Sequence, residues 1–174
     1  MSDWINEVED RLQREESNQE RLARRDDVLR SRASAYWYEL TEAVKEQISR
    51  INKSERIQLE VKCELKYHEE NVSSFRVEKQ VFPSITLSVS RSGDKIMIRK
   101  VRTDVKNPET YFRDGLVKSS REEKEELQLI LDENEGLAIR GKNQQLLSPE
   151  DIPRYLLEPL LVPATEVRNP YRFN

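Results

Sequence analysis

The chain has 174 residues, enough for one ordinary domain with an appendage. Charged residues make up 36% of it, yet 30 Lys and Arg nearly balance 33 Asp and Glu. A single cysteine and a single histidine exclude an internal disulfide and a Cys/His metal site, so we expect no metal and no other cofactor. Apolar stretches fall far short of the ~20 residues of a membrane helix, and the first residues resemble no secretory signal. We therefore expect a cytoplasmic protein.

The N-terminal third differs in kind from the rest. Residues 1–53 contain neither Gly nor Pro, and their apolar side chains recur in steps of three, four and seven. That spacing is typical of one face of a helix. The apolar stripe is dense over Ala33–Ile51, which predicts a helix lying on a sheet. We predict two helical pieces, about 3–31 and 34–52, with Ser31–Ser34 as a joint between them.

The first of these helical pieces is too polar to be held by its own burial. Glu15, Gln19 and Asp26 occupy positions that a coiled coil fills with apolar side chains. The piece is therefore either a solvated arm or a surface completed by another chain, and a solvated face is the more common case. We divide the chain into a charged helical arm, a single α+β domain and an extended C-terminal tail, at residues 1–32, 33–163 and 164–174.

A period of two begins after Glu55, because apolar and polar residues alternate over residues 57–67. This alternation predicts a long strand with one buried and one wet face. Cys63 and His68 are five positions apart, so on one strand their side chains point to opposite faces. We expect Cys63 to be a buried, inert thiol and His68 a solvated imidazole, which argues against a thiol–imidazole catalytic pair.

Further strands are predicted from the same alternation at Phe75–Val81, Ile85–Ser90 and Lys95–Arg102. Ser92–Asp94 supplies the turn between the last two. Pro83 separates the first two, because proline cannot donate to a sheet ladder.

Residues 121–134 allow two interpretations. Ser120 followed by Glu123 fits a helix-capping box, whereas the leucines of 127–131 alternate as in a strand. We favour a hairpin, because Gly136 can take the left-handed backbone conformation that such a loop often needs.

The last predicted element is a helix. Ser148 can cap it, Pro149 fits its first turn, and residues 152–161 give it a broad apolar side. The fold class that we predict is therefore α+β, with a long N-terminal helical region, an antiparallel sheet of five or six strands, and a C-terminal helix packed on the sheet.

One motif imitates a nucleotide site. Gly136, Gly141 and Lys142 have the spacing of a phosphate-binding loop. That loop needs a Ser or Thr hydroxyl for magnesium, and Asn143 stands in its place. The residues between the glycines also alternate like a strand. We interpret the match as chance, and without a catalytic cluster we expect a protein that is not an enzyme.

Basic residues gather around the predicted strand 95–102. Nucleic acid binding uses such cations for phosphates, although a solvated edge strand explains them equally well. This candidate anion or nucleic-acid patch consists of Arg91, Lys95, Arg99, Lys100, Arg102 and Lys106.

Our leading functional hypothesis is a non-enzymatic protein-interaction module, a homodimer whose arm contributes contacts. For Trp37 core packing is the first interpretation and a partner anchor the second. The alternatives are nucleic-acid binding through the basic patch, a secretion-type chaperone, or a small-ligand-binding protein. The candidate partner-binding residues are Trp4, Leu12, Leu22, Leu29 and Trp37.

Overall fold

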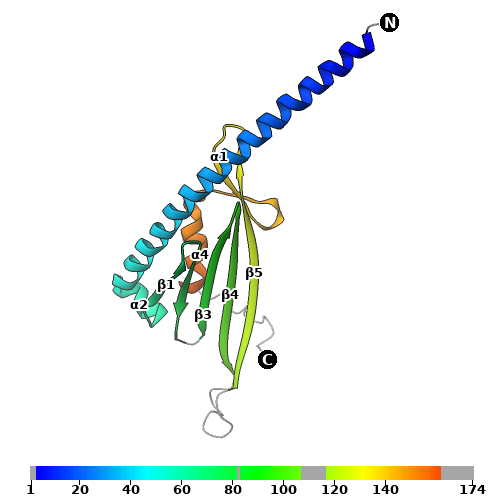
Figure 1. Ribbon diagram of the computed structural model, residues 1–174. Coiled ribbons are helices and arrows are strands. Elements are labelled where there is room, and N and C mark those ends of the chain that lie inside the picture. Colours follow the sequence, from blue (N-terminus) through cyan, green and yellow to red (C-terminus); the bar gives the residue numbers. More distant parts are fainter. Residues whose placement is uncertain (1–2, 82, 107–116, 162–174) are drawn as a thin grey trace, which may run out of the picture.

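The computed structural model describes residues 3–81, 83–106 and 117–161, so the predicted tail 164–174 lies outside the described residues. A long helix leads into an antiparallel sheet, and a short helix follows it (Figure 1). The elements in chain order are α1 (Asp3–Lys53), α2 (Glu55–Val61), β1 (Leu65–Asn71), β2 (Ser74–Lys79), β3 (Ser84–Ser92), β4 (Lys95–Lys106), β5 (Val117–Leu131), β6 (Leu137–Arg140), the 3₁₀ turn η2 (Lys142–Gln144), β7 (Leu146–Leu147), the 3₁₀ turn η3 (Pro149–Asp151) and α4 (Ile152–Leu161).

The N-terminal helix is continuous, so the predicted joint at Ser31–Ser34 is wrong. No Gly or Pro interrupts the helix there, and Ala33 lies fully buried on its inner side. The Ser34 hydroxyl does not cap a new helix. It accepts a hydrogen bond from Arg91 Nη1 at 3.0 Å. The serines therefore serve the contact with the sheet and leave the helical backbone intact.

The strand predicted at 57–67 is wrong over its first half. Ser54 caps the helix α2, whose Ile57 N–H donates to the Ser54 hydroxyl oxygen at 3.4 Å. Lys62 ends α2 in the left-handed conformation, with φ at 61°. Only from Leu65 onward does the chain form a strand, β1.

The side chain of Asn52 connects the end of α1 to the start of β1. Its Nδ2 donates to the Leu65 carbonyl at 2.9 Å, and its Oδ1 accepts from the Leu65 N–H at 2.9 Å. Asn52 thus satisfies both backbone groups of Leu65, as a neighbouring strand would. These two hydrogen bonds fix where the chain passes from helix to sheet.

The predicted fold class is confirmed. The described residues form one seven-stranded antiparallel sheet in which every strand pairs with its neighbour in sequence. Seven strands are one more than the upper number of the expected five or six, because β7 has only two residues and leaves little pattern in the sequence. The hairpin favoured for the ambiguous segment is also confirmed, since β5 pairs antiparallel with β6.

The glycine of that hairpin has a different role from the predicted one. Glu135 takes the left-handed conformation, with φ at 58°. The backbone N–H of Gly136 donates to Asp132 Oδ1 at 2.6 Å. A Cβ at Gly136 would lie only 2.6 Å from the other Asp132 carboxylate oxygen, so any larger residue here would displace that carboxylate.

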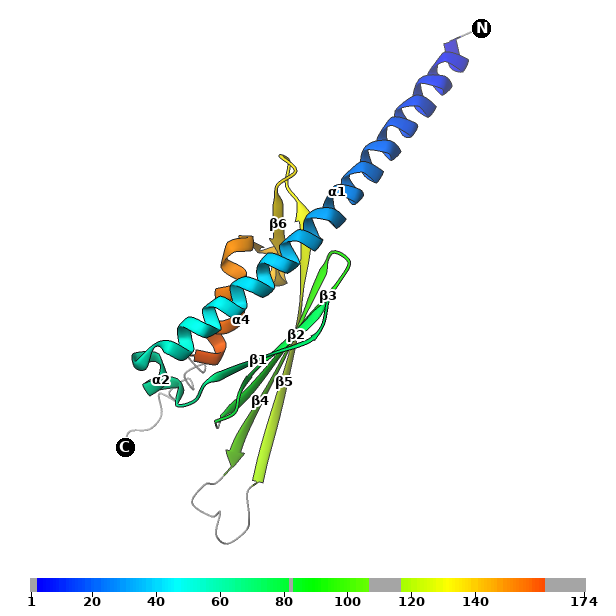
Figure 2. The ribbon, with the colours of Figure 1, turned by 60° about the vertical axis from the view of Figure 1, so that its left-hand side comes forward.

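Helices cover one face of the sheet. The second half of α1 crosses this face, with α2 and α4 beside it (Figure 2). Buried and less buried residues alternate along β2 and β3, as a sheet with one dry face requires. The largest fully buried side chains include Leu40 and Val44 of α1 and Phe75, Ile85, Ile96, Leu127, Leu129 and Ile139 of the sheet.

The predicted C-terminal helix is present, with two differences at its start. Ser148 stands at the cap position, but its side chain makes no capping hydrogen bond there. A 3₁₀ turn with Pro149 at its start precedes α4. The Tyr36 hydroxyl donates to the Pro149 carbonyl at 2.8 Å and so links α1 to this turn. Among the helices of the described ranges, none has both the length and the apolar content to traverse a bilayer.

Candidate functional site: the projecting half of the first helix

The first part of α1 extends away from the rest of the molecule (Figure 1). Every side chain from Trp4 to Arg24 is exposed, and we call residues 4–24 the arm. At 1.5 Å per residue these 21 residues extend about 30 Å. We call the remaining described residues the body. The arm is therefore a helix without a covering element among the described residues.

Three of the predicted partner-binding residues lie on the arm. Trp4, Leu12 and Leu22 are 64%, 54% and 59% exposed. Ile5 and Val8 are also exposed and were not among the predicted contacts, although they belong to the same apolar spacing. At about 100° per residue all five fall within an arc of about 100°, so they form one apolar face.

The other two predicted contacts lie in the body. Leu29 is half-buried and packs against the core. Trp37 is only 5% exposed; its indole N–H donates to the Val72 carbonyl at 2.9 Å, and its ring lies 5.6 Å from that of Phe75. The first interpretation of Trp37, core packing, is confirmed, and its neighbour Tyr38 is the exposed aromatic of this group.

The arm meets the body at Arg25. Its guanidinium Nη2 donates to the Leu131 carbonyl at 3.1 Å and approaches the Asp132 carbonyl at 3.4 Å. Because Arg25 contacts the end of β5, the free part of the helix ends several residues before the boundary expected at Arg32.

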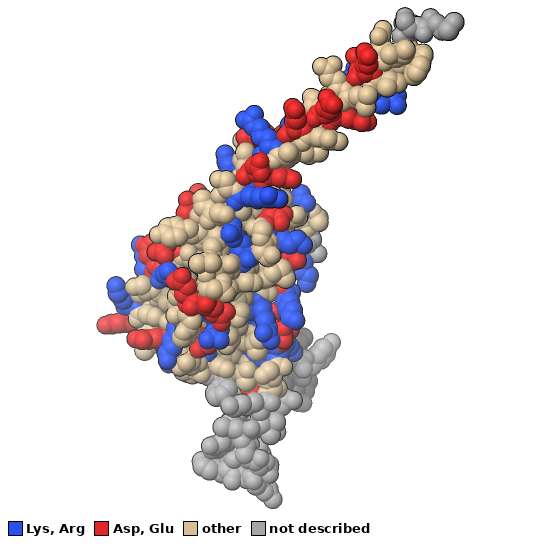
Figure 3. All heavy atoms as spheres, viewed as in Figure 1, with Lys and Arg blue, Asp and Glu red and all other residues tan. Residues whose placement is uncertain are grey.

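Charge is distributed unevenly along the outer part of α1. Residues 3–20 hold seven Asp and Glu against two Arg, a net charge of −5. Residues 21–32 hold five Arg against two Asp, a net charge of +3. Figure 3 shows red and blue side chains along the whole arm. The helix thus has an acidic outer segment and a basic inner segment.

The predicted basic patch is divided between the two faces of the sheet. Lys95 and Arg99 alternate with the buried Ile96 and Ile98 and therefore lie on the outer face, whereas Lys100 and Arg102 lie on the helix-covered side. Arg91 contacts Ser34, as described above. The side chain of Lys106 lies outside the described part of the chain.

Four of the six cations of this group are paired with carboxylates. Lys95 bonds Glu126 at 2.7 Å, Arg99 bonds Glu122 at 2.9 Å, and Arg102 bonds Asp104 at 3.0 Å, while Lys100 pairs with Glu123. The hydrogen bond from Arg99 lowers the pKa of Glu122, and that from Lys100 lowers the pKa of Glu123. The structure does not bring these residues together as one free cationic surface.

The lone cysteine and histidine occupy different elements. Cys63 lies in the connection between α2 and β1, half-buried against the core. His68 lies in β1, with its Nε2 3.6 Å from a Glu78 carboxylate oxygen on β2. The expectation that one strand separates them fails, because that strand does not include Cys63. Within the described residues no group of three His, Cys, Asp or Glu could hold a metal ion.

The segment that imitates a phosphate-binding loop is confirmed as a strand. Residues 137–140 form β6, and only a short 3₁₀ turn follows. A phosphate-binding loop would instead lead into a helix whose N-terminus faces the phosphate.

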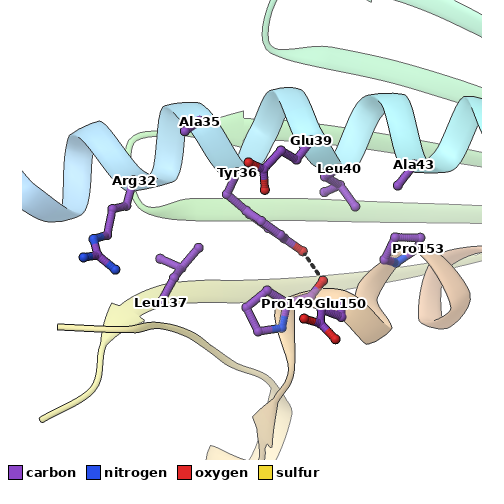
Figure 4. A pocket seen from close by; sticks show the side chains of 10 residues that line it. All are labelled: Arg32, Ala35, Tyr36, Glu39, Leu40, Ala43, Leu137, Pro149, Glu150 and Pro153. Carbon is purple, nitrogen blue, oxygen red and sulfur yellow. Dashed lines mark hydrogen bonds between the residues drawn. The ribbon is translucent and has the colours of Figure 1, made fainter. Parts of the chain in front are cut away.

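A groove of about 440 Å³ lies between α1 and the start of α4 (Figure 4). The Tyr36 side chain crosses it to reach Pro149, so its hydroxyl is already engaged. Burial raises the pKa of that hydroxyl well above its usual value. The groove is lined by Arg32, Ala35, Tyr36, Glu39, Leu40, Ala43, Leu137, Pro149, Glu150 and Pro153.

Comparisons with protein-family models, with curated proteins and with solved structures found no match.

Proposed function

We propose that this protein is a non-enzymatic interaction module that associates with a second copy of itself through the arm. The observation that supports this proposal most is the apolar face of the arm. It continues the stripe of α1 beyond the sheet, and no described element covers it.

Burial of that face has a sizeable free-energy gain. A large apolar side chain contributes about 1.5–3 kcal/mol when it passes from full exposure to full burial. Trp4, Leu12 and Leu22 are each more than half exposed, so each has most of that gain still available. A single polar helix of about 20 residues is only marginally stable in water, so pairing also stabilises the arm's own conformation.

The experiment compares molar masses by light scattering after size exclusion, on the full chain. We expect a dimer for the natural sequence and a monomer for the triple variant Trp4→Ser, Leu12→Ser, Leu22→Ser. All three positions are exposed, so the body keeps its fold.

A matched control carries three substitutions on the opposite side of the arm, Asn6→Ala, Gln13→Ala and Ser17→Ala. These positions are exposed as well, and this control should stay dimeric. A natural chain that stays monomeric up to a concentration of about 100 µM would contradict the proposal. Its free energy of dimerisation would then be weaker than about −5.5 kcal/mol.

A further inference from the structure

We infer that the two arms pair antiparallel, related by a two-fold axis that passes the helices at the level of Ser17. This inference rests on the proposed self-association and adds to it the direction and register of the pairing. Three properties of α1 support it: the symmetry of its stripe, the polar residues within the stripe, and the charge along the helix.

The spacing of the stripe is the same in both directions. Its positions are 5, 8, 12, 15, 19, 22, 26 and 29, with steps of three and four that mirror each other about residue 17. An antiparallel pair centred there brings Leu12 level with Leu22 of the second copy. It also brings Glu15 level with Gln19 of the second copy, so that polar meets polar and apolar meets apolar near the centre.

A parallel pair would instead bring identical polar residues together. A closed parallel dimer has its two-fold axis along the helices and therefore places each residue beside its own copy. Glu15 would then face Glu15 and Asp26 would face Asp26 within the contact, where like charges repel and water is partly excluded. The antiparallel register separates these carboxylates, because Asp26 lies level with Val8 of the second copy.

The charge distribution favours the same direction. The antiparallel arrangement sets residues 3–13, with a net charge of −3, beside residues 21–31 of the second copy, with a net charge of +2. Residues 14–20 lie beside the same segment of the second copy in either direction. Packed helices lie 8–10 Å apart, which is about one Debye length at physiological salt, so these net charges attract each other. A parallel arrangement sets acidic beside acidic and basic beside basic.

In this register the two bodies lie at opposite ends of the pair. Residues 3–7 of each helix come level with residues 27–31 of the second copy, where α1 packs against its own body. The overlap of residues 8–26 uses most of the arm and ends close to Arg25, where α1 reaches its own body.

Disulfide trapping tests the direction. Two full-length chains are prepared in a Cys63→Ala background, one with Leu12→Cys and one with Leu22→Cys, and one of them carries a tag that separates the products by mass. After mixing and mild oxidation, we expect the product that joins position 12 to position 22 at roughly tenfold the yield of either self-joined product.

Geometry sets this expectation. In the antiparallel register two copies of position 12 lie about 15 Å apart along the helices, at 1.5 Å per residue. A disulfide needs Cα atoms within about 7 Å, so neither variant alone can form the bond within such a dimer. A Gln13→Cys chain, with its thiol on the far side of the arm, measures the background of random collisions.

The outcomes separate the two proposals. Self-joined products at 12 and at 22, with the mixed product at background, would overturn the antiparallel inference while self-association stands. Background yields throughout, together with a monomer mass for the natural chain, would overturn both.

Discussion

The two halves of α1 have the same helical period and the same lack of Gly and Pro, yet they differ in what lies beneath them. Leu22 in the arm is 59% exposed, whereas Leu40 in the body is 1% exposed. The comparison shows that one helical period runs through all 51 residues of α1, while burial depends on residues far away in the chain.

The apolar stripe of α1 also differs between the two halves. In the body half, apolar residues follow at nearly every turn, and Ala33, Leu40 and Val44 are all buried. In the arm, Glu15 and Gln19 interrupt the stripe. A sheet accepts a continuous apolar face, whereas an interrupted one suits a partner that brings its own polar groups to the same level.

The largest difference between the two halves of α1 is expected when matched leucines are shortened. We expect Leu40→Ala to lower the free energy of unfolding by about 2–5 kcal/mol, because it leaves a cavity in the core. Leu22→Ala should change it by no more than about 0.5 kcal/mol, because the side chain is exposed. Urea unfolding, at a dilution where light scattering finds monomers, measures both. Equal losses would mean that the arm is part of the folded core.

A smaller loss of stability is expected from a substitution at the connection between the helices and the sheet. Asn52→Ala removes both hydrogen bonds to Leu65 and should cost about 1–3 kcal/mol, because partly buried backbone groups lose their partners. Ser49→Ala, three residues earlier and exposed, is the matched control and should be nearly neutral. The same urea titrations apply. A neutral Asn52→Ala would mean that water replaces the side chain without loss.

The smallest effect concerns the ion pairs on β4 and β5. The pKa values of Glu122 and Glu123 lie below the usual 4.5 in the folded protein. Groups with a depressed folded pKa stabilise the fold above their unfolded pKa, and this contribution is lost as the pH falls through the folded value. The effect is small, because surface ion pairs contribute little.

A double variant, Glu122→Gln with Glu123→Gln, isolates this contribution. Melting temperatures measured between neutral pH and about pH 3 should fall less steeply for the variant than for the natural chain. Parallel acid profiles would show that these two carboxylates do not contribute.

The sequence predicts the fold class because the strand signals lie where side chains alternate strictly, as in β3. It fails at residues 57–67, where the two periods coincide. Ile57 and Val61 are four apart, which suits a helix as well as a strand, and both pack toward the core. Leu59 decides between the two interpretations, since a strand would bury it and in α2 it is 78% exposed. Burial of that kind depends on the neighbouring elements and cannot be read from spacing alone.

The candidate site was predictable in part. The exposure of Trp4, Leu12 and Leu22 follows from the thin stripe around them. The division of the basic patch also follows from the sequence, because Arg99 and Lys100 are adjacent on a strand and must point to opposite faces. Their pairing with carboxylates of β5 depends on a long-range register that spacing does not reveal.

The order of the sheet has a consequence for synthesis on the ribosome. Each strand joins the one made just before it, so pairing can advance hairpin by hairpin. The N-terminal helix emerges first, yet its contacts at Leu131 and Pro149 come from residues made about a hundred positions later. Before β1 and β2 are made, the apolar stripe of this helix has no strand to pack on. A second nascent chain on the same messenger RNA exposes the same stripe beside it.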